Sequence, residues 1–181
     1  MSLNLQRTVD DKFINEVEYA LKDIPEHLIQ FVRDSGTKLY LLDKSIKPSY
    51  IGLDVPFFID ISGLGRSCDD TSCVIYNTKN KKSEIRMMNH EHSSIRHEFG
   101  HAIDFNLDFI SEKHDYKGTP LDWYAGLNTH ERFAQAFDAY FTYKENPNNE
   151  FIHTKKDLLE REPELYKLID SIVCGNFISN I

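Results

Sequence analysis

The chain has 181 residues, of which 40% are hydrophobic and 28% are charged, as expected for one globular domain spanning residues 1–181. Its formal net charge of -8 opposes binding to phosphate backbones and anionic lipid surfaces, so nucleic acid is not an expected partner. No apolar run reaches the roughly 20 residues that a membrane span requires. The first 13 residues lack the apolar core of a signal peptide, and nothing in the composition indicates an oligomeric state.

The first half of the chain is predicted to combine two helices with a small sheet. Helical periodicity covers Asp10–Ile24 and Glu26–Asp34, which are separated by Pro25. Strand-like runs follow at Thr37–Leu42, Phe57–Ile61, Cys73–Tyr76 and Glu84–Met88. The polar segment 77–83 is expected to join the last two as a hairpin. In the preceding loop, Cys68 can form a local bridge with Cys73, or both can remain thiols.

The second half is predicted to be helical. One helix is expected to start at the cap residue Asn89 and to continue with an apolar stripe through Phe105. After a loop over 111–128, Thr129 is expected to cap a second helix that runs to about Tyr143. Residues 157–173 are expected to close the chain as one or two helices around Pro163. The predicted fold class is therefore α+β, with a small mixed sheet followed by a helical half.

The motif that carries the chemistry is His97-Glu98-Phe99-Gly100-His101. Residues four apart on a helix lie about 40° from each other around the axis, so both imidazoles can reach one ion. Glu98 lies one step round from His97, where a general base for metal-activated water has to stand. Within an apolar-periodic helix, three polar side chains without partners would be costly to bury. The motif therefore predicts a zinc site.

A catalytic zinc needs a third protein ligand and one open position. The following predicted helix offers Glu131, Asp138 and Glu145 as carboxylates, together with His130. Glu131 is favoured because it lies in the first helical turn beside a loop. The alternative is that Glu131 is an ordinary first-turn glutamate stabilised by the helix dipole.

Three parts of the sequence together resemble a known family. They are the motif with its continuation to Asp104, then Tyr124, and then the run Glu131-Arg132-Phe133-Ala134-Gln135-Ala136-Phe137. The pattern is similar to the catalytic domain of anthrax lethal factor and to the secreted bacterial Pro-Pro endopeptidases. The resemblance implies a zincin-like fold, Zn²⁺ as cofactor and Glu131 as third ligand. It also implies that Tyr124, seven residues before Glu131, donates a hydrogen bond to the developing oxyanion.

The resemblance extends to residues that support the metal ligands. It implies that Asp104, one turn beyond His101, holds a metal-binding histidine in place. Two positions depart from the family pattern, since Arg132 replaces an aromatic residue and Gln135 replaces an acidic one. Gln135 keeps the hydrogen-bonding capacity of a supporting residue but not the charge, so the electrostatics of the site are expected to differ from those of the family.

The predicted function is zinc-dependent hydrolysis of peptide bonds in a peptide or protein. The family implies a preference for proline-containing sites, secretion, and an extended substrate that pairs with an edge strand at Val74, Ile75 and Tyr76. Three alternatives remain, namely a zinc-binding but inactive recognition module, an intracellular regulatory metalloprotease, and a structural domain with a chance motif. The absent signal peptide fits a cytoplasmic location. Trp123 is expected to pack, and no role is assigned to the histidines outside the motif.

Overall fold

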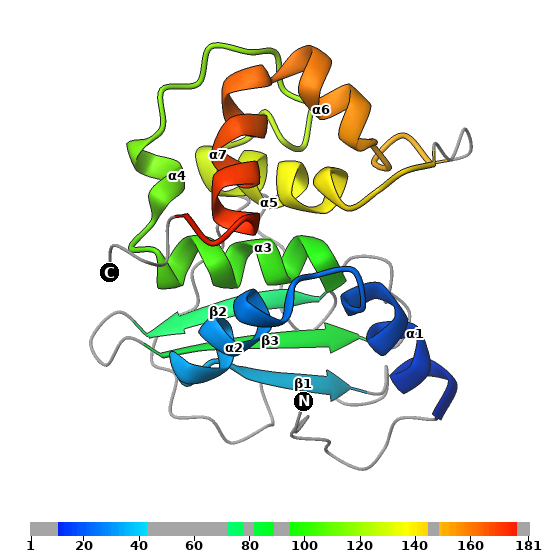
Figure 1. Cartoon of the computed structure of the whole chain (residues 1–181). Helices are drawn as coiled ribbons and strands as arrows, with labels where there is room; N and C mark the ends of the chain where they lie inside the picture. The colour runs from blue at the N-terminus through cyan, green and yellow to red at the C-terminus, as the bar shows by residue number, and fades with distance from the viewer. Residues whose placement is uncertain (1–10, 43–71, 78–81, 89–94, 145–148, 177–181) are drawn as a thin grey trace.

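A computed structural model describes residues 11–42, 72–77, 82–88, 95–144 and 149–176 of the chain. Seven helices and three strands lie in these ranges (Figure 1). In chain order they are α1 (Asp11–Leu21), α2 (Glu26–Asp34), β1 (Lys38–Leu42), β2 (Cys73–Asn77), β3 (Lys82–Met88), α3 (Ile95–Asn106), α4 (Ile110–Lys113), α5 (Thr129–Tyr140), α6 (Lys155–Arg161) and α7 (Pro163–Val173). The mixed α+β class predicted from the sequence is confirmed.

The sheet has the strand order β1-β3-β2. The central strand β3 pairs in parallel with β1 and antiparallel with β2, so the sheet is mixed and the predicted hairpin is confirmed. Ile85 of β3 is opposite Leu39 on one side and Val74 on the other, and all three side chains are buried. The predicted strand at 57–61 and the loop with Cys68 lie outside the described residues.

Helix α3 lies between the sheet and the C-terminal helices (Figure 1). It packs on β2 and β3 on one side and on α5 on the other, while α1 and α2 also contact it. All residues from His97 to Phe105 are buried, as expected for a helix enclosed on every side. The His97–His101 motif therefore lies between the described sheet and the C-terminal helices.

Several predicted boundaries are wrong. The cap of α5 is Asn128, whose side chain accepts a hydrogen bond from the Glu131 amide at 2.9 Å, and the helix ends at Tyr140. A short helix, α4, interrupts the predicted loop after residues 108 and 109, which both adopt positive φ. Helix α6 starts two residues earlier than predicted because Thr154 forms a capping box with Asp157. The predicted start of α3, at Asn89, lies outside the described residues.

The two C-terminal helices divide where the sequence predicts. Pro163 occupies the first turn of α7, where its missing amide hydrogen costs nothing. Of the helices in the described ranges, none combines the length and the apolar character that a membrane crossing requires.

Candidate metal centre

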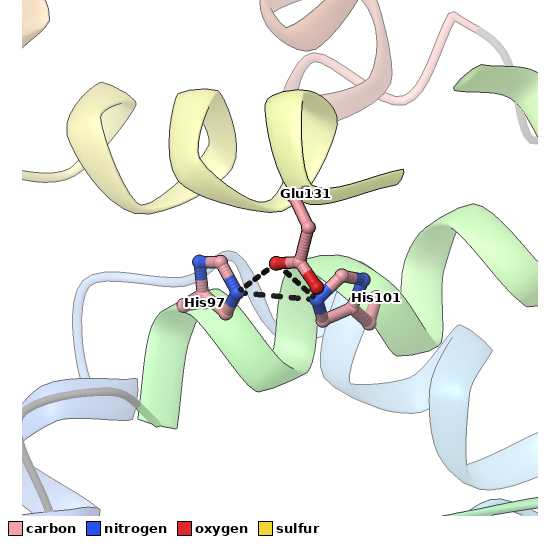
Figure 2. A group of neighbouring side chains, drawn as sticks. All are labelled: His97, His101 and Glu131. Carbon is pink, nitrogen blue, oxygen red and sulfur yellow. Dashed lines mark hydrogen bonds and ion pairs between the residues drawn. The ribbon is translucent and has the colours of Figure 1, made fainter. Parts of the chain in front are cut away.

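Three side chains from two helices meet at the predicted zinc site, and we call them the metal group: His97, His101 and Glu131. Figure 2 shows both imidazoles on α3 and the carboxylate reaching down from α5. The His97 Nε2 and His101 Nε2 atoms are 3.1 Å apart. Glu131 Oε2 lies 3.0 Å from the first and 3.3 Å from the second. Long-range packing has therefore brought the candidate third ligand to the pair on one helix.

The spacing of these atoms fits a metal ion. Two ligands of a tetrahedral zinc at about 2.0–2.1 Å are separated by roughly 3.3 Å, close to the three distances observed here. Two nitrogens and one carboxylate oxygen also form a donor set that zinc accepts. The group can therefore hold a metal ion through three protein ligands, with a fourth position left for water or substrate.

The electrostatics of the metal-free group show how tightly its members are coupled. Burial disfavours a charged His97, but the hydrogen bond and charge of Glu131, aided by Glu98 and Asp138, raise its pKa to about 9. Burial likewise disfavours an ionised Glu131, yet the charges and hydrogen bonds of His101 and His97 lower its pKa well below the usual range. A positive charge is thus stabilised at the place where a metal ion would supply one.

Gln135 orients one ligand. Its amide nitrogen donates to the Phe151 carbonyl at 2.5 Å, and its Oε1 lies 3.2 Å from His97 Nδ1. Because the Phe151 carbonyl can only accept, the amide oxygen of Gln135 has to face the imidazole. His97 then carries its hydrogen on Nδ1 and directs Nε2 toward the metal group. The uncharged side chain at position 135 therefore still supports the site.

The contact between α3 and α5 sets the position of Glu131. A Cβ atom added to Gly100 would lie 3.0 Å from both Ala134 Cα and Phe137 Cβ, so only glycine allows this approach without displacement. At one end of the antiparallel pair, Arg96 Nε donates to Asp138 Oδ1 at 2.7 Å. The helices are thus fixed in register on either side of the metal group.

Asp104 lies at the other end of the contact between α3 and α5. Its carboxylate accepts hydrogen bonds from the amide and hydroxyl of Ser111, at 2.8 and 2.7 Å, and lies 2.8 Å from His130 Nδ1. The expectation that Asp104 holds a metal-binding histidine has no support in these contacts. Instead, Asp104 ties the end of α3 to the residue next to Glu131. His130 was a candidate ligand in the sequence, but its partners here are Asp104 and Ser111, and Ser111 had no sequence signal because it belongs to no recognisable spacing.

The other predicted site residues lie on α3, near His97 and on β2. Glu98 is buried on α3 beside His97. The Tyr124 ring centroid is 5.9 Å from that of His97. Val74, Ile75 and Tyr76 belong to β2, which pairs only with β3 among the described strands and is therefore an edge strand of the described sheet.

Other candidates have different partners. Arg132 forms an ion pair with the buried Glu162 through two of its nitrogens, Nε and Nη2, and also donates to the Gly118 carbonyl. Because Glu162 lies between α6 and α7, the arginine at this position helps α5 to pack against these two helices. Asp138 is bound by Arg96, and Glu145 lies outside the described residues. Trp123 was expected to pack, but 54% of its surface is exposed.

Comparisons with known proteins identify the fold. No family model matches the sequence. No curated protein matches it either. Among solved structures, the chain is similar to the Pro-Pro endopeptidase PPEP-2 from Paenibacillus alvei, with a TM-score of 0.60 over 94% of this chain and 96% of that one. Only 18% of the aligned residues are identical. The chain therefore has the fold of a Pro-Pro endopeptidase, and this likeness does not single out the lethal factor family.

Proposed function

We propose that this protein is a zinc-dependent endopeptidase. The observation that carries the proposal is the metal group, whose three ligand atoms lie 3.0–3.3 Å apart beside Glu98 and Tyr124. The similarity in fold to a solved Pro-Pro endopeptidase supports the same conclusion. Endopeptidase action on a peptide or protein would use all five of these residues.

Each side chain has a distinct part in the proposed reaction. Zinc bound to the metal group would supply a Lewis acid that polarises the peptide carbonyl and makes water more acidic. Glu98 would accept the proton from the attacking water and pass it to the leaving amine. Tyr124 would donate a hydrogen bond to the carbonyl oxygen as that oxygen becomes negative. Gln135 would keep His97 in the tautomer that binds zinc.

The substrate is proposed to be an extended peptide. An edge strand such as β2 offers backbone amides and carbonyls that a peptide can pair with, and α3 packs directly on this strand. The family resemblance of the sequence motif adds two further proposals, namely cleavage at proline-containing sites and secretion, and the name of the solved Pro-Pro endopeptidase agrees with the first.

The test is a digest of a diverse peptide library by the zinc-loaded wild type and by Glu98→Ala, with new termini read by mass spectrometry. We expect cleavage by the wild type alone, and we expect a chelator to abolish it. The Glu98→Ala protein should still bind one zinc, because the metal group is intact. The cleaved sequences would also show whether proline is required.

Two results would contradict the proposal. Equal cleavage by Glu98→Ala and wild type would exclude Glu98 as the base. Stoichiometric zinc with no cleavage by either protein, even with proline-rich and folded-protein substrates, would favour a recognition module in place of an enzyme.

A further inference from the structure

Two large aromatic side chains lie exposed beside the metal group. Trp123 is 54% exposed and Phe151 is 37% exposed, and their ring centroids are 5.8 Å apart in an edge-to-face arrangement. Tyr124 contacts both rings, at 5.8 Å from Trp123 and 6.5 Å from Phe151. We call Trp123 and Phe151 the aromatic platform. Adjoining exposed aromatic rings form a contiguous apolar patch, and such patches mark binding sites more often than single exposed rings do.

The platform is built from two distant segments that polar contacts hold together. His153, two residues after Phe151, has its Nε2 atom 2.8 Å from Oδ2 of Asp122, which directly precedes Trp123. The other oxygen of Asp122 accepts from the Ala125 amide at 2.7 Å and fixes the turn that carries Trp123. A surface ordered in advance loses little conformational entropy when a ligand binds, so this arrangement favours recognition.

Gln135 joins the platform to the metal group. The same amide that contacts His97 Nδ1 donates to the carbonyl of Phe151. The ring centroids of His97 and Tyr124 are 5.9 Å apart, and those of Tyr124 and Trp123 are 5.8 Å apart. An extended peptide advances about 3.3 Å per residue. A peptide bond at the metal group is therefore within about four residues of a side chain that lies on Trp123.

We propose that the aromatic platform is the subsite that binds an apolar side chain of the substrate, within about four residues of the cleaved bond. This inference rests on the proposed peptidase function and adds a substrate class to it. Apolar rings and aliphatic side chains gain from contact with exposed aromatic faces, whereas acidic and small polar side chains gain little.

The first measurement compares cleavage preferences. Wild type, Trp123→Ala, Phe151→Ala and the control Tyr143→Ala, which removes a different exposed aromatic, would digest the same peptide library. For peptides that carry the apolar residue selected by wild type, we expect kcat/KM to fall about 10- to 100-fold in the platform variants. Peptides with serine at that position should change less than threefold, and Tyr143→Ala should match wild type.

The second measurement follows peptide binding in a variant that should not cleave the peptide. Trp123 is the only tryptophan in the chain, so all tryptophan fluorescence reports on the platform. In zinc-loaded Glu98→Gln, acrylamide quenching would be compared with no peptide, with the best-cleaved peptide, and with that peptide carrying serine in place of its apolar residue. We expect the apolar peptide to shield Trp123 and the serine peptide to leave it exposed.

The outcomes separate the subsite from the proposed function. If wild type cleaves peptides but Trp123 is quenched equally in all three samples and the variants keep the wild-type preference, the subsite is wrong and the peptidase stands. If wild type cleaves nothing, the proposed function fails and the subsite fails with it. Zinc content and circular dichroism of each variant would verify folding, and Trp123→Phe, which should retain most of the preference, provides a conservative check.

Discussion

The metal group and the aromatic platform adjoin each other but are built in opposite ways. His97, His101 and Glu131 are 3–8% exposed and come from two packed helices, whereas Trp123 and Phe151 are 54% and 37% exposed and come from segments outside the helices. Metal binding and proton transfer need side chains held to within fractions of an ångström. Recognition of an apolar side chain depends more on the apolar contact area than on exact side-chain geometry. The contrast explains why rigid helices carry one site and connecting segments the other.

Removing a ligand should have the largest effect. Glu131→Gln replaces the charged carboxylate with a poorer ligand and leaves the positive charge favoured at His97 without its main partner. We expect zinc affinity to fall by about a thousandfold or more, measured by competition with a chromophoric chelator. The matched control is Glu164→Gln on the exposed face of α7, which should bind zinc as wild type does. Retained affinity in Glu131→Gln would remove this residue from the ligand set.

Losing the Tyr124 hydroxyl should impair catalysis while leaving the metal in place. Removing one donor to a developing oxyanion typically lowers turnover about 10²- to 10³-fold. Tyr124→Phe is therefore expected to show that loss in kcat with wild-type zinc content, and Tyr143→Phe should show none. The phenyl ring of the variant would still contact the platform, so peptide preference should be unchanged. Unchanged turnover would mean that Tyr124 only supports the platform.

The raised pKa of His97 predicts a pH dependence in the metal-free protein. A histidine with a pKa near 6.5 when unfolded and about 9 when folded stabilises the fold fully below pH 6.5. That contribution is lost as pH rises through 9, and it amounts to at most about 3 kcal/mol. Urea unfolding in excess chelator should show this decline between pH 6.5 and 9, and His97→Gln should lack it.

Zinc affinity should change with pH in the opposite direction over the same range. Because a metal ion binds neutral His97, the proton has to leave first, and zinc affinity should rise with pH up to about 9. Calorimetry in buffers of different ionisation enthalpy would count the proton released per zinc. Zinc binding without proton release near pH 7 would show that His97 is already neutral there.

The smallest effect is expected at the helix contact that positions Glu131. Gly100→Ala adds a Cβ atom 3.0 Å from Ala134 Cα and Phe137 Cβ, which pushes α5 away by a few tenths of an ångström. The gain in helix propensity, about 1 kcal/mol, is offset by overpacking of about 1–3 kcal/mol. Thermal unfolding should show a net loss of about 1 kcal/mol, with weaker zinc binding. A more stable variant with wild-type zinc affinity would show that the contact is tolerant.

Local patterns in the sequence were sufficient for part of this molecule. The spacing of His97 and His101 places both imidazoles on one side of any helix, because four residues make about one turn. Two strand-like runs and the polar turn between them likewise predicted β2, β3 and their hairpin, because neighbouring strands need only a short connection. Apolar periodicity alone predicted the buried face of α1.

Other features depended on contacts between residues far apart in the chain. In the sequence, Glu131 was one of four candidate ligands. In the structure, α5 packs over Gly100 and places Glu131 Oε2 3.0 Å from His97 Nε2. That Asp104 supports a metal-binding histidine stays a prediction from the family resemblance, whereas its contacts with Ser111 of α4 and His130 of α5 appeared only in the tertiary structure. The pairing of Trp123 with Phe151 follows no periodicity, since the two residues are joined only through side-chain contacts across the fold. Helix and strand geometry repeats along the chain and can be read there, whereas the meeting of separate segments depends on how the whole core packs.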